Sequence, residues 1–168
     1  MAIPLHRPKL NLDEAVRNSV TESVIEILQG TFSISAELID FRKIVNYSVA
    51  GDISGTVGMI QEKHEGNMVV SFSRASLGQI LRRVYGLSLD EGGELMRDGA
   101  AELTNMIYGK IKFRLAAIGY EFAMTLPSVI MGSNHNINQG SKSQSGLFIF
   151  QFDQTFLFHV VVTLTQDR

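Results

Sequence analysis

The sequence contains no cysteine, which excludes disulfides, thiolate catalysis and any zinc or iron–sulfur site held by cysteine. It also lacks a long apolar segment. The longest strongly apolar run, residues 156–164, includes His159 and is far too short to span a bilayer. The first residues contain no apolar run of signal-peptide length. We therefore expect a soluble, cytoplasmic protein that does not enter a membrane.

An excess of charge of one sign is also missing. The formal net charge is −2, from 15 basic and 17 acidic residues. Such a balance gives no electrostatic reason to expect nucleic acid or an anionic membrane as a partner. With 168 residues, of which 45% are hydrophobic, the chain can bury a sizeable core, and we expect a single domain over residues 1–168.

The usual catalytic signatures are absent as well. The four histidines lie in unrelated segments without metal-ligand spacing, so each is expected to be structural or solvated. The glycines at 51, 55 and 58 match neither phosphate-loop fingerprint and are expected in hairpins. Residues 140–146 hold three serines but no nucleophile elbow. We expect no metal site and no cofactor of the chain's own.

Helix signals are clear in three places. A capping stretch, Asn11 to Glu14, opens a first helix that Gly30 is expected to close. Ser73 and Gly86 bracket a short helix over about 74–85. A long helix is predicted over about 94–118, before Gly119.

The segments between and after these helices are rich in β-branched residues and glycine. We expect strands at about 44–53, 55–61 and 67–73, with a turn at 65–67. A strand over 120–131, interrupted at Pro127, is expected next. Residues 132–146 are polar and small, which predicts an exposed, flexible hairpin loop. The last strands are expected at 147–152 and 156–165, and the final one is apolar on both faces, as in a central strand or a buried interface strand.

A helix and three strands, followed by helices and three strands, predict an α+β fold. Its long helices would pack on a largely antiparallel sheet of about six strands.

The long helix has two contrasting faces. At 100° per residue, its apolar residues gather in one arc that is expected to be buried: Met96, Ala100, Leu103, Ile107, Ile111 and Ile118. The opposite side carries a polar strip, defined here as Asp98, Glu102, Asn105, Gly109 and Ala116. Asn and Gly are poor helix residues, so their presence in mid-helix needs a reason beyond helix stability.

The surroundings of the polar strip favour a contact surface. Leu95, Met106 and Phe113 are predicted along one flank of the strip, and Tyr108 and Leu115 along the other. Apolar side chains beside exposed polar groups are typical of protein-contact surfaces, whereas a plain solvated helix face is the alternative. Gly109 would let another surface approach closely next to Asn105.

The segment Asp98-x-x-x-Glu102-x-x-Asn105, followed later by Pro127, resembles the signature of the CheC/CheX/FliY phosphatases of bacterial chemotaxis. In this sequence 21 residues separate Asn105 from Pro127, one fewer than in the family pattern. CheC-like members carry a second Glu-x-x-Asn on an earlier helix, whereas here Glu26-x-x-Gln29 has Gln in place of Asn. One site per chain is most similar to CheX.

The resemblance implies a CheC/CheX-like fold with an internal pseudo-twofold arrangement. It also implies a phosphatase (a hydrolase) that removes the aspartyl phosphate of a CheY-like response regulator in chemotaxis signalling. Asn105 would orient the attacking water, and Glu102 would pair with the regulator's lysine. Asp98, Leu95, Met106 and Gly109 would contact the partner. Mg²⁺ is expected on the regulator, and the family also implies a homodimer.

Two other functions remain open at this point. A non-catalytic domain that binds response regulators would use the same surface without turnover. A structural dimerisation domain would leave the polar strip as a solvated face. Substitution of Glu102 and Asn105 distinguishes these functions from catalysis.

Overall fold

The computed structural model describes residues 12–45, 48–61, 64–86, 93–123, 125–138 and 143–165. Three helices and six strands follow one another along the chain: α1 (Glu14–Phe32), β1 (Ala36–Val45), β2 (Ser48–Gln61), β3 (His64–Phe72), α2 (Arg74–Tyr85), α3 (Glu94–Ala117), β4 (Ser128–Asn138), β5 (Ser143–Phe152) and β6 (Phe156–Thr165).

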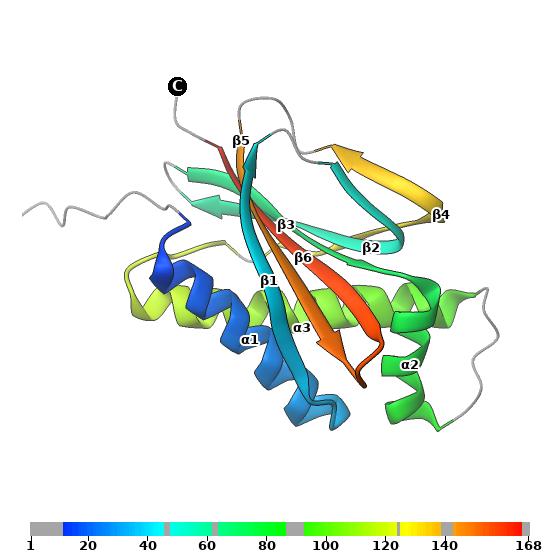
Figure 1. Cartoon of the computed structure of the whole chain (residues 1–168). Coiled ribbons are helices and arrows are strands. Elements are labelled where there is room, and N and C mark those ends of the chain that lie inside the picture. The colour runs from blue at the N-terminus through cyan, green and yellow to red at the C-terminus, as the bar shows by residue number, and fades with distance from the viewer. Residues whose placement is uncertain are drawn as a thin grey trace, which may run out of the picture.

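The six strands form one antiparallel sheet in the order β1-β5-β6-β3-β2-β4. The helices lie on one side of this sheet, and α1 and α3 pack against each other beneath it (Figure 1). Exchanging β1–β3 with β4–β6 reproduces the same strand order read backwards. The α+β fold and the pseudo-twofold arrangement are therefore confirmed.

Helix boundaries follow the capping residues closely. The Asp13 carboxylate accepts a hydrogen bond from the Val16 N–H at 3.0 Å, and the Ser73 hydroxyl accepts one from the Ser76 N–H at 3.1 Å. Gly86 ends α2 in the left-handed region, with φ 66°. The expected end of α1 at Gly30 is wrong. The helix continues to Phe32, whose ring is buried, and burial of that ring outweighs the helix cost of one glycine.

The strand boundaries between residues 36 and 73 differ from the prediction. Residues 44–53 and 55–61 do not form two strands, because β2 runs unbroken through Gly55, which pairs with both β3 and β4. The expected turn at 65–67 lies inside β3. β1 begins at Ala36, and its first half was missed because charged residues occupy it, as is common at a sheet edge.

Residues 120–123 and 125–127 are not the predicted strand. They are attached to β2 by isolated hydrogen bonds, from the Ala123 N–H to the Ile60 carbonyl (2.9 Å) and from the Thr125 hydroxyl to the Gly58 carbonyl (2.7 Å). A regular ladder with β2 starts only after Pro127, which has no N–H to donate.

The predicted loop over 132–146 is also corrected. Residues 132–138 belong to β4 and residues 143–146 to β5, while 139–142 lie outside the described part of the chain. The 14-residue β2 is long enough to pair with β4 as far as Ser48–Asn138. Backbone pairing therefore holds a stretch whose side chains could not build a core.

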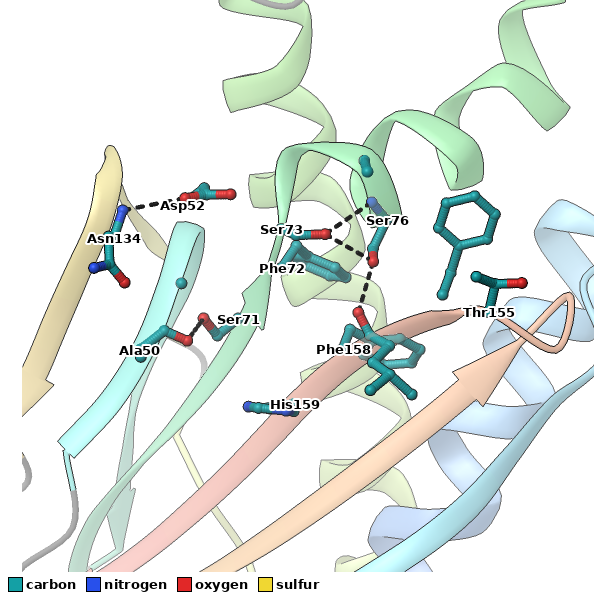
Figure 2. A pocket seen from close by; sticks show the side chains of 14 residues that line it. Ala50, Asp52, Ser71, Phe72, Ser73, Ser76, Asn134, Thr155, Phe158 and His159 are labelled. Atoms are coloured by element: carbon teal, nitrogen blue, oxygen red, sulfur yellow. Dashed lines mark hydrogen bonds between the residues drawn. The ribbon is translucent and has the colours of Figure 1, made fainter.

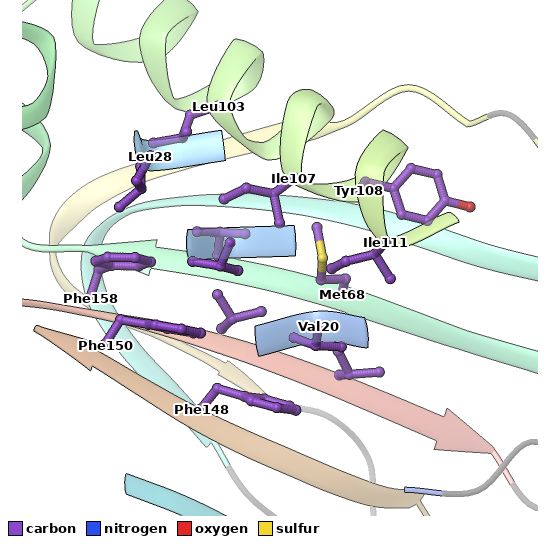
Figure 3. Close-up of a cluster of buried hydrophobic side chains, with 14 of the residues drawn as sticks. Val20, Leu28, Met68, Leu103, Ile107, Tyr108, Ile111, Phe148, Phe150 and Phe158 are labelled. Atoms are coloured by element: carbon purple, nitrogen blue, oxygen red, sulfur yellow. The ribbon is translucent and has the colours of Figure 1, made fainter. Parts of the chain in front are cut away.

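The core lies between the helices and the sheet. Residues Val20 and Leu28 of α1 and Leu103 and Ile107 of α3 meet Met68, Phe148, Phe150 and Phe158 of the sheet (Figure 3). β6 is central, as its sequence predicted. Its residues Val160 and Val162 face the helices, whereas Val161 joins a smaller buried cluster on the opposite face of the sheet.

Candidate functional site

The buried face of α3 is the predicted one, with one exception. Met96, Ala100, Leu103, Ile107 and Ile111 are all buried. Ile118 is 41% exposed, so its predicted burial is wrong. The helix ends at Ala117 and Ile118 leaves the helical conformation (φ −108°, ψ 14°), so the helical angle no longer decides where its side chain lies.

The polar strip faces solvent. Asp98, Glu102, Gly109 and Ala116 are exposed, and Asn105 is partly buried. Glu102 and Asn105 are three residues apart on one helix, which places their side chains next to each other. Neither side chain makes a hydrogen bond or an ion pair with another residue that the structure describes. The carboxylate and the amide are therefore available to a partner.

Only one flank of the polar strip is apolar and accessible. Leu95 and Phe113 are 39% and 71% exposed, and Met106 is partly buried. We call these three residues the apolar flank. The other predicted flank is wrong, since Tyr108 and Leu115 are buried.

The segment that follows α3 explains the burial of Tyr108. Its hydroxyl donates to the Ala123 carbonyl at 2.9 Å, which ties the ring to the irregular stretch after α3. Burial raises the pKa of the Tyr108 hydroxyl. The helix periodicity could not predict this contact, because Ala123 lies beyond the helix.

Ion pairs fix the other half of α3 against α1. The Arg114 guanidinium contacts Glu22 and Glu26, each at 2.6 Å, and the Lys110 ammonium contacts Glu26 at 2.7 Å. The hydrogen bonds from Lys110 and Arg114 lower the pKa of the Glu26 carboxyl. The acid of Glu26-x-x-Gln29 is therefore engaged within the chain, unlike Glu102.

Two close contacts determine the position of α3, and the sequence did not predict either of them. A Cβ atom on Gly55 would meet the Thr104 hydroxyl oxygen within 1.9 Å, and one on Gly99 would meet the Leu81 side chain at 2.6 Å. These glycines allow β2 and α2 to approach α3 closely. The small residues were visible in the sequence, but their neighbours belong to other elements.

A second polar region lies away from α3. A cleft of about 570 Å³ lies between β2, β3, β4, β6 and the start of α2, and no described α3 residue lines it. Figure 2 shows the side chains that line this cleft. The Asp52 carboxylate accepts hydrogen bonds from the backbone N–H of Asn134 (3.1 Å) and of Arg74 (3.2 Å), which lower its pKa.

The structure describes the side chains of two histidines, His135 and His159, and their surroundings differ. His135 lies between the Ser54 hydroxyl (2.8 Å) and the Gly132 carbonyl (3.0 Å), which satisfies both of its ring nitrogens. Burial lowers the pKa of the His159 ring, which keeps it neutral near pH 7. His6 and the side chain of His64 lie outside the described residues. Within the described ranges no group of three or more His, Asp or Glu could hold a metal ion.

A comparison with known protein families identifies the family of this chain. Residues 44–151, which include all of α2, α3 and the polar strip, match the model of the chemotaxis phosphatase CheX. The chain belongs to the CheX family. None of its described helices combines the length and apolarity needed to cross a membrane.

Solved structures of similar fold agree with this family. A putative chemotaxis protein from Desulfovibrio vulgaris Hildenborough is similar at a TM-score of 0.83 and 24% identity, over 93% of this chain and 99% of that one. The chemotaxis protein CheX from Vibrio vulnificus is similar at 0.81 and 24%, over 89% and 98%. A chain of the CheX–CheY–BeF3–Mg²⁺ complex from Borrelia burgdorferi is similar at 0.72 and 18%, over 93% and 100%. These likenesses show the fold. A search of curated protein sequences finds no significant match.

Proposed function

We propose that this protein is a phosphatase that hydrolyses the aspartyl phosphate of a CheY-like response regulator. The observation that carries the proposal is the pair of Glu102, which is exposed, and Asn105, which is partly buried. Neither side chain has a partner among the described residues, and both lie on a helix within the CheX-family segment. A fold similar to that of a chain solved in complex with CheY supports the choice of partner.

The reaction requires little covalent chemistry from the phosphatase. A water molecule attacks the phosphorus atom opposite the aspartyl oxygen, and the bond between phosphorus and that oxygen breaks. The regulator's carboxylate leaves, and the proton of the water passes to the released phosphate. The Asn105 amide can both accept from and donate to this water, so it can hold the water in line. The regulator would bring its own Mg²⁺.

Glu102 has a different task in this proposal. Its carboxylate lies one turn before Asn105. It would pair with the active-site lysine of the regulator, and this contact would fix how the two proteins are positioned against each other. Asp98, Leu95, Met106 and Gly109 would contact the surrounding surface of the regulator. The homodimer that the family resemblance implies remains a prediction, which analytical ultracentrifugation can measure.

The deciding experiment compares wild type with Asn105→Ala on phosphorylated CheY-like regulators from the source organism. We expect wild type to accelerate phosphate loss. Asn105→Ala should lose at least about a hundredfold in rate, by analogy with removal of one positioned polar group, while its affinity for the regulator stays within about twofold. Equal acceleration by both proteins would remove the role of Asn105. Binding without acceleration by wild type would favour a non-catalytic regulator-binding domain.

A further inference from the structure

We propose that the response regulator docks on two helices, with the exposed C-terminal turn of α2 as the second half of the binding surface. This inference rests on the proposed function. It assigns Val84 and Tyr85, which lie outside the polar strip, to recognition of the regulator.

The apolar stripe of α2 extends beyond the core. Leu77 and Leu81 are buried at 0% and 2% exposure, whereas Val84 and Tyr85 continue the same face one turn later and are each 49% exposed. Residues at spacings of four, seven and eight share one face of a helix. The last turn of α2 therefore presents the apolar side of an amphipathic helix without a described partner.

The exposed turn of α2 follows directly on the point where this helix crosses α3. α2 packs on α3 where Gly99 admits the Leu81 side chain. One helical turn is 5.4 Å, so Tyr85 lies about one turn beyond the crossing on α2. Leu95 lies one turn before it on α3, and Glu102 about one turn after it. In Figure 1 α2 crosses the N-terminal part of α3 and runs on beside the turn between β5 and β6.

The exposed apolar residues also share one side of the polar strip. At 100° per residue, Gly99 and the three residues of the apolar flank, Leu95, Met106 and Phe113, fall within about 40° of one another. α2 therefore joins α3 on the side of the apolar flank. The opposite side is closed, because Tyr108 is buried and its hydroxyl donates to the Ala123 carbonyl.

The chemistry of this surface fits a folded protein domain. A tyrosine, a valine and the apolar flank lie on one side of an acid and an amide, and exposed apolar side chains beside polar groups are typical of protein-contact surfaces. Its continuity with Glu102 and Asn105 points to the partner that those two residues would engage. The turn is also held in place, since Arg83 makes an ion pair of 2.9 Å with Asp153 of the β5–β6 turn.

The test uses Val84→Asp and Tyr85→Ala in the full chain, with Val45→Asp as the matched control. Val45 is 65% exposed at the end of β1, on the far edge of the sheet from β4. Affinity for a beryllofluoride-activated CheY-like regulator is measured by calorimetry, and kcat and KM by phosphate release. Thermal melts check that every variant is folded.

We expect both α2 variants to raise Kd and KM at least tenfold, with kcat at saturation within about twofold of wild type. The control should leave all three within about twofold. Wild-type values for both α2 variants would overturn the two-helix surface while leaving the proposed function intact. If the wild type binds the regulator without hydrolysing it, the Kd values of the α2 variants alone decide: a tenfold rise supports the two-helix surface and an unchanged Kd overturns it. A wild type that neither binds nor dephosphorylates any CheY-like regulator of the source organism would overturn both proposals.

Discussion

Glu26 and Glu102 are the same residue type on neighbouring helices, and their surroundings differ. The Glu26 carboxylate is paired with Lys110 and Arg114, whereas Glu102 has no described partner inside the chain. A carboxylate that is already paired within its own chain is less available to bind a partner protein. This contrast at the scale of single residues supports one regulator site per chain, on α3.

Glu102→Ala should separate binding from stability. Glu102 is exposed, so we expect the free energy of unfolding to change by no more than about 0.5 kcal/mol. Affinity for the regulator should fall at least tenfold, because a charge contact across the interface is lost. Urea denaturation and calorimetry measure the two quantities. Glu26→Ala, one helix away, is the control and should leave the affinity unchanged; equal loss in both variants would contradict the site.

Asp52 should contribute to stability in a pH-dependent way. Its folded-state pKa is lowered by hydrogen bonds from the Asn134 and Arg74 N–H groups, so its contribution is present above the unfolded value of 3.8. The contribution is lost as the pH falls through the lower, folded value. Asp52→Ala should cost about 1–2 kcal/mol at pH 7.

Denaturation at pH 7 and at pH 3 measures this change, and the gap between wild type and variant should narrow at the lower pH. Asp40→Ala is the control, because among the described residues Asp40 pairs only with the exposed Arg42 on the edge strand. If the difference in unfolding free energy stays constant between the two pH values, the hydrogen bonds from Asn134 and Arg74 do not stabilise the ionised Asp52 carboxylate.

At the scale of elements, α3 carries a glycine that its own stability does not require. A Cβ atom on Gly109 would meet nothing within 4 Å, and the residue is exposed in the helix interior. Alanine is therefore sterically permitted and favoured by helix propensity. In the proposed function, this glycine lets a partner backbone approach closely next to Asn105.

Gly109→Ala should move stability and binding in opposite directions. We expect the free energy of unfolding to rise by about 0.5–1 kcal/mol, while Kd for the regulator rises at least threefold because the added methyl group enters the interface. Gly30→Ala is a matched control, since Gly30 is also exposed in a helix with open space at its Cβ. That control should gain stability and keep its affinity. Unchanged binding in Gly109→Ala would argue against close approach.

At the scale of the whole molecule, the two halves of the chain cannot form separate sheets. Within the described part of the chain β1 pairs only with β5, and β4 pairs only with β2, so each edge strand depends on the other half. The central pair, β3 with β6, also joins the halves. α1 and α3 contact each other and share one core.

We therefore expect one cooperative unfolding transition over the whole chain. Urea curves recorded by far-UV circular dichroism and by tyrosine fluorescence should coincide, and the calorimetric and van't Hoff enthalpies should agree. The chain has four tyrosines and no tryptophan, which makes tyrosine the useful fluorophore. Two separated transitions would mean that the halves are independent domains.

Local chemistry predicted some elements well. Ser73 and Gly86 set the ends of α2, and the apolar arc of α3 is buried as expected from Met96 to Ile111. These features depend on capping atoms and on a helical period that neighbouring residues determine by themselves. Strand boundaries depended on partners distant in sequence. β1 was partly missed, and residues 132–138 proved to be a strand, because pairing with β5 and β2 respectively supplies what their side chains do not indicate.

The sequence by itself determined the polar strip with Glu102 and Asn105, the family resemblance and the α+β class, since each follows from residue type and spacing. Only the tertiary structure decided which flank of the strip stays open. Tyr108 is buried and bonded to Ala123 from beyond the helix, and Gly99 lets Leu81 of α2 pack on the other side. Burial and close approach are properties of elements that meet in space, so the periodicity of a single helix does not contain them.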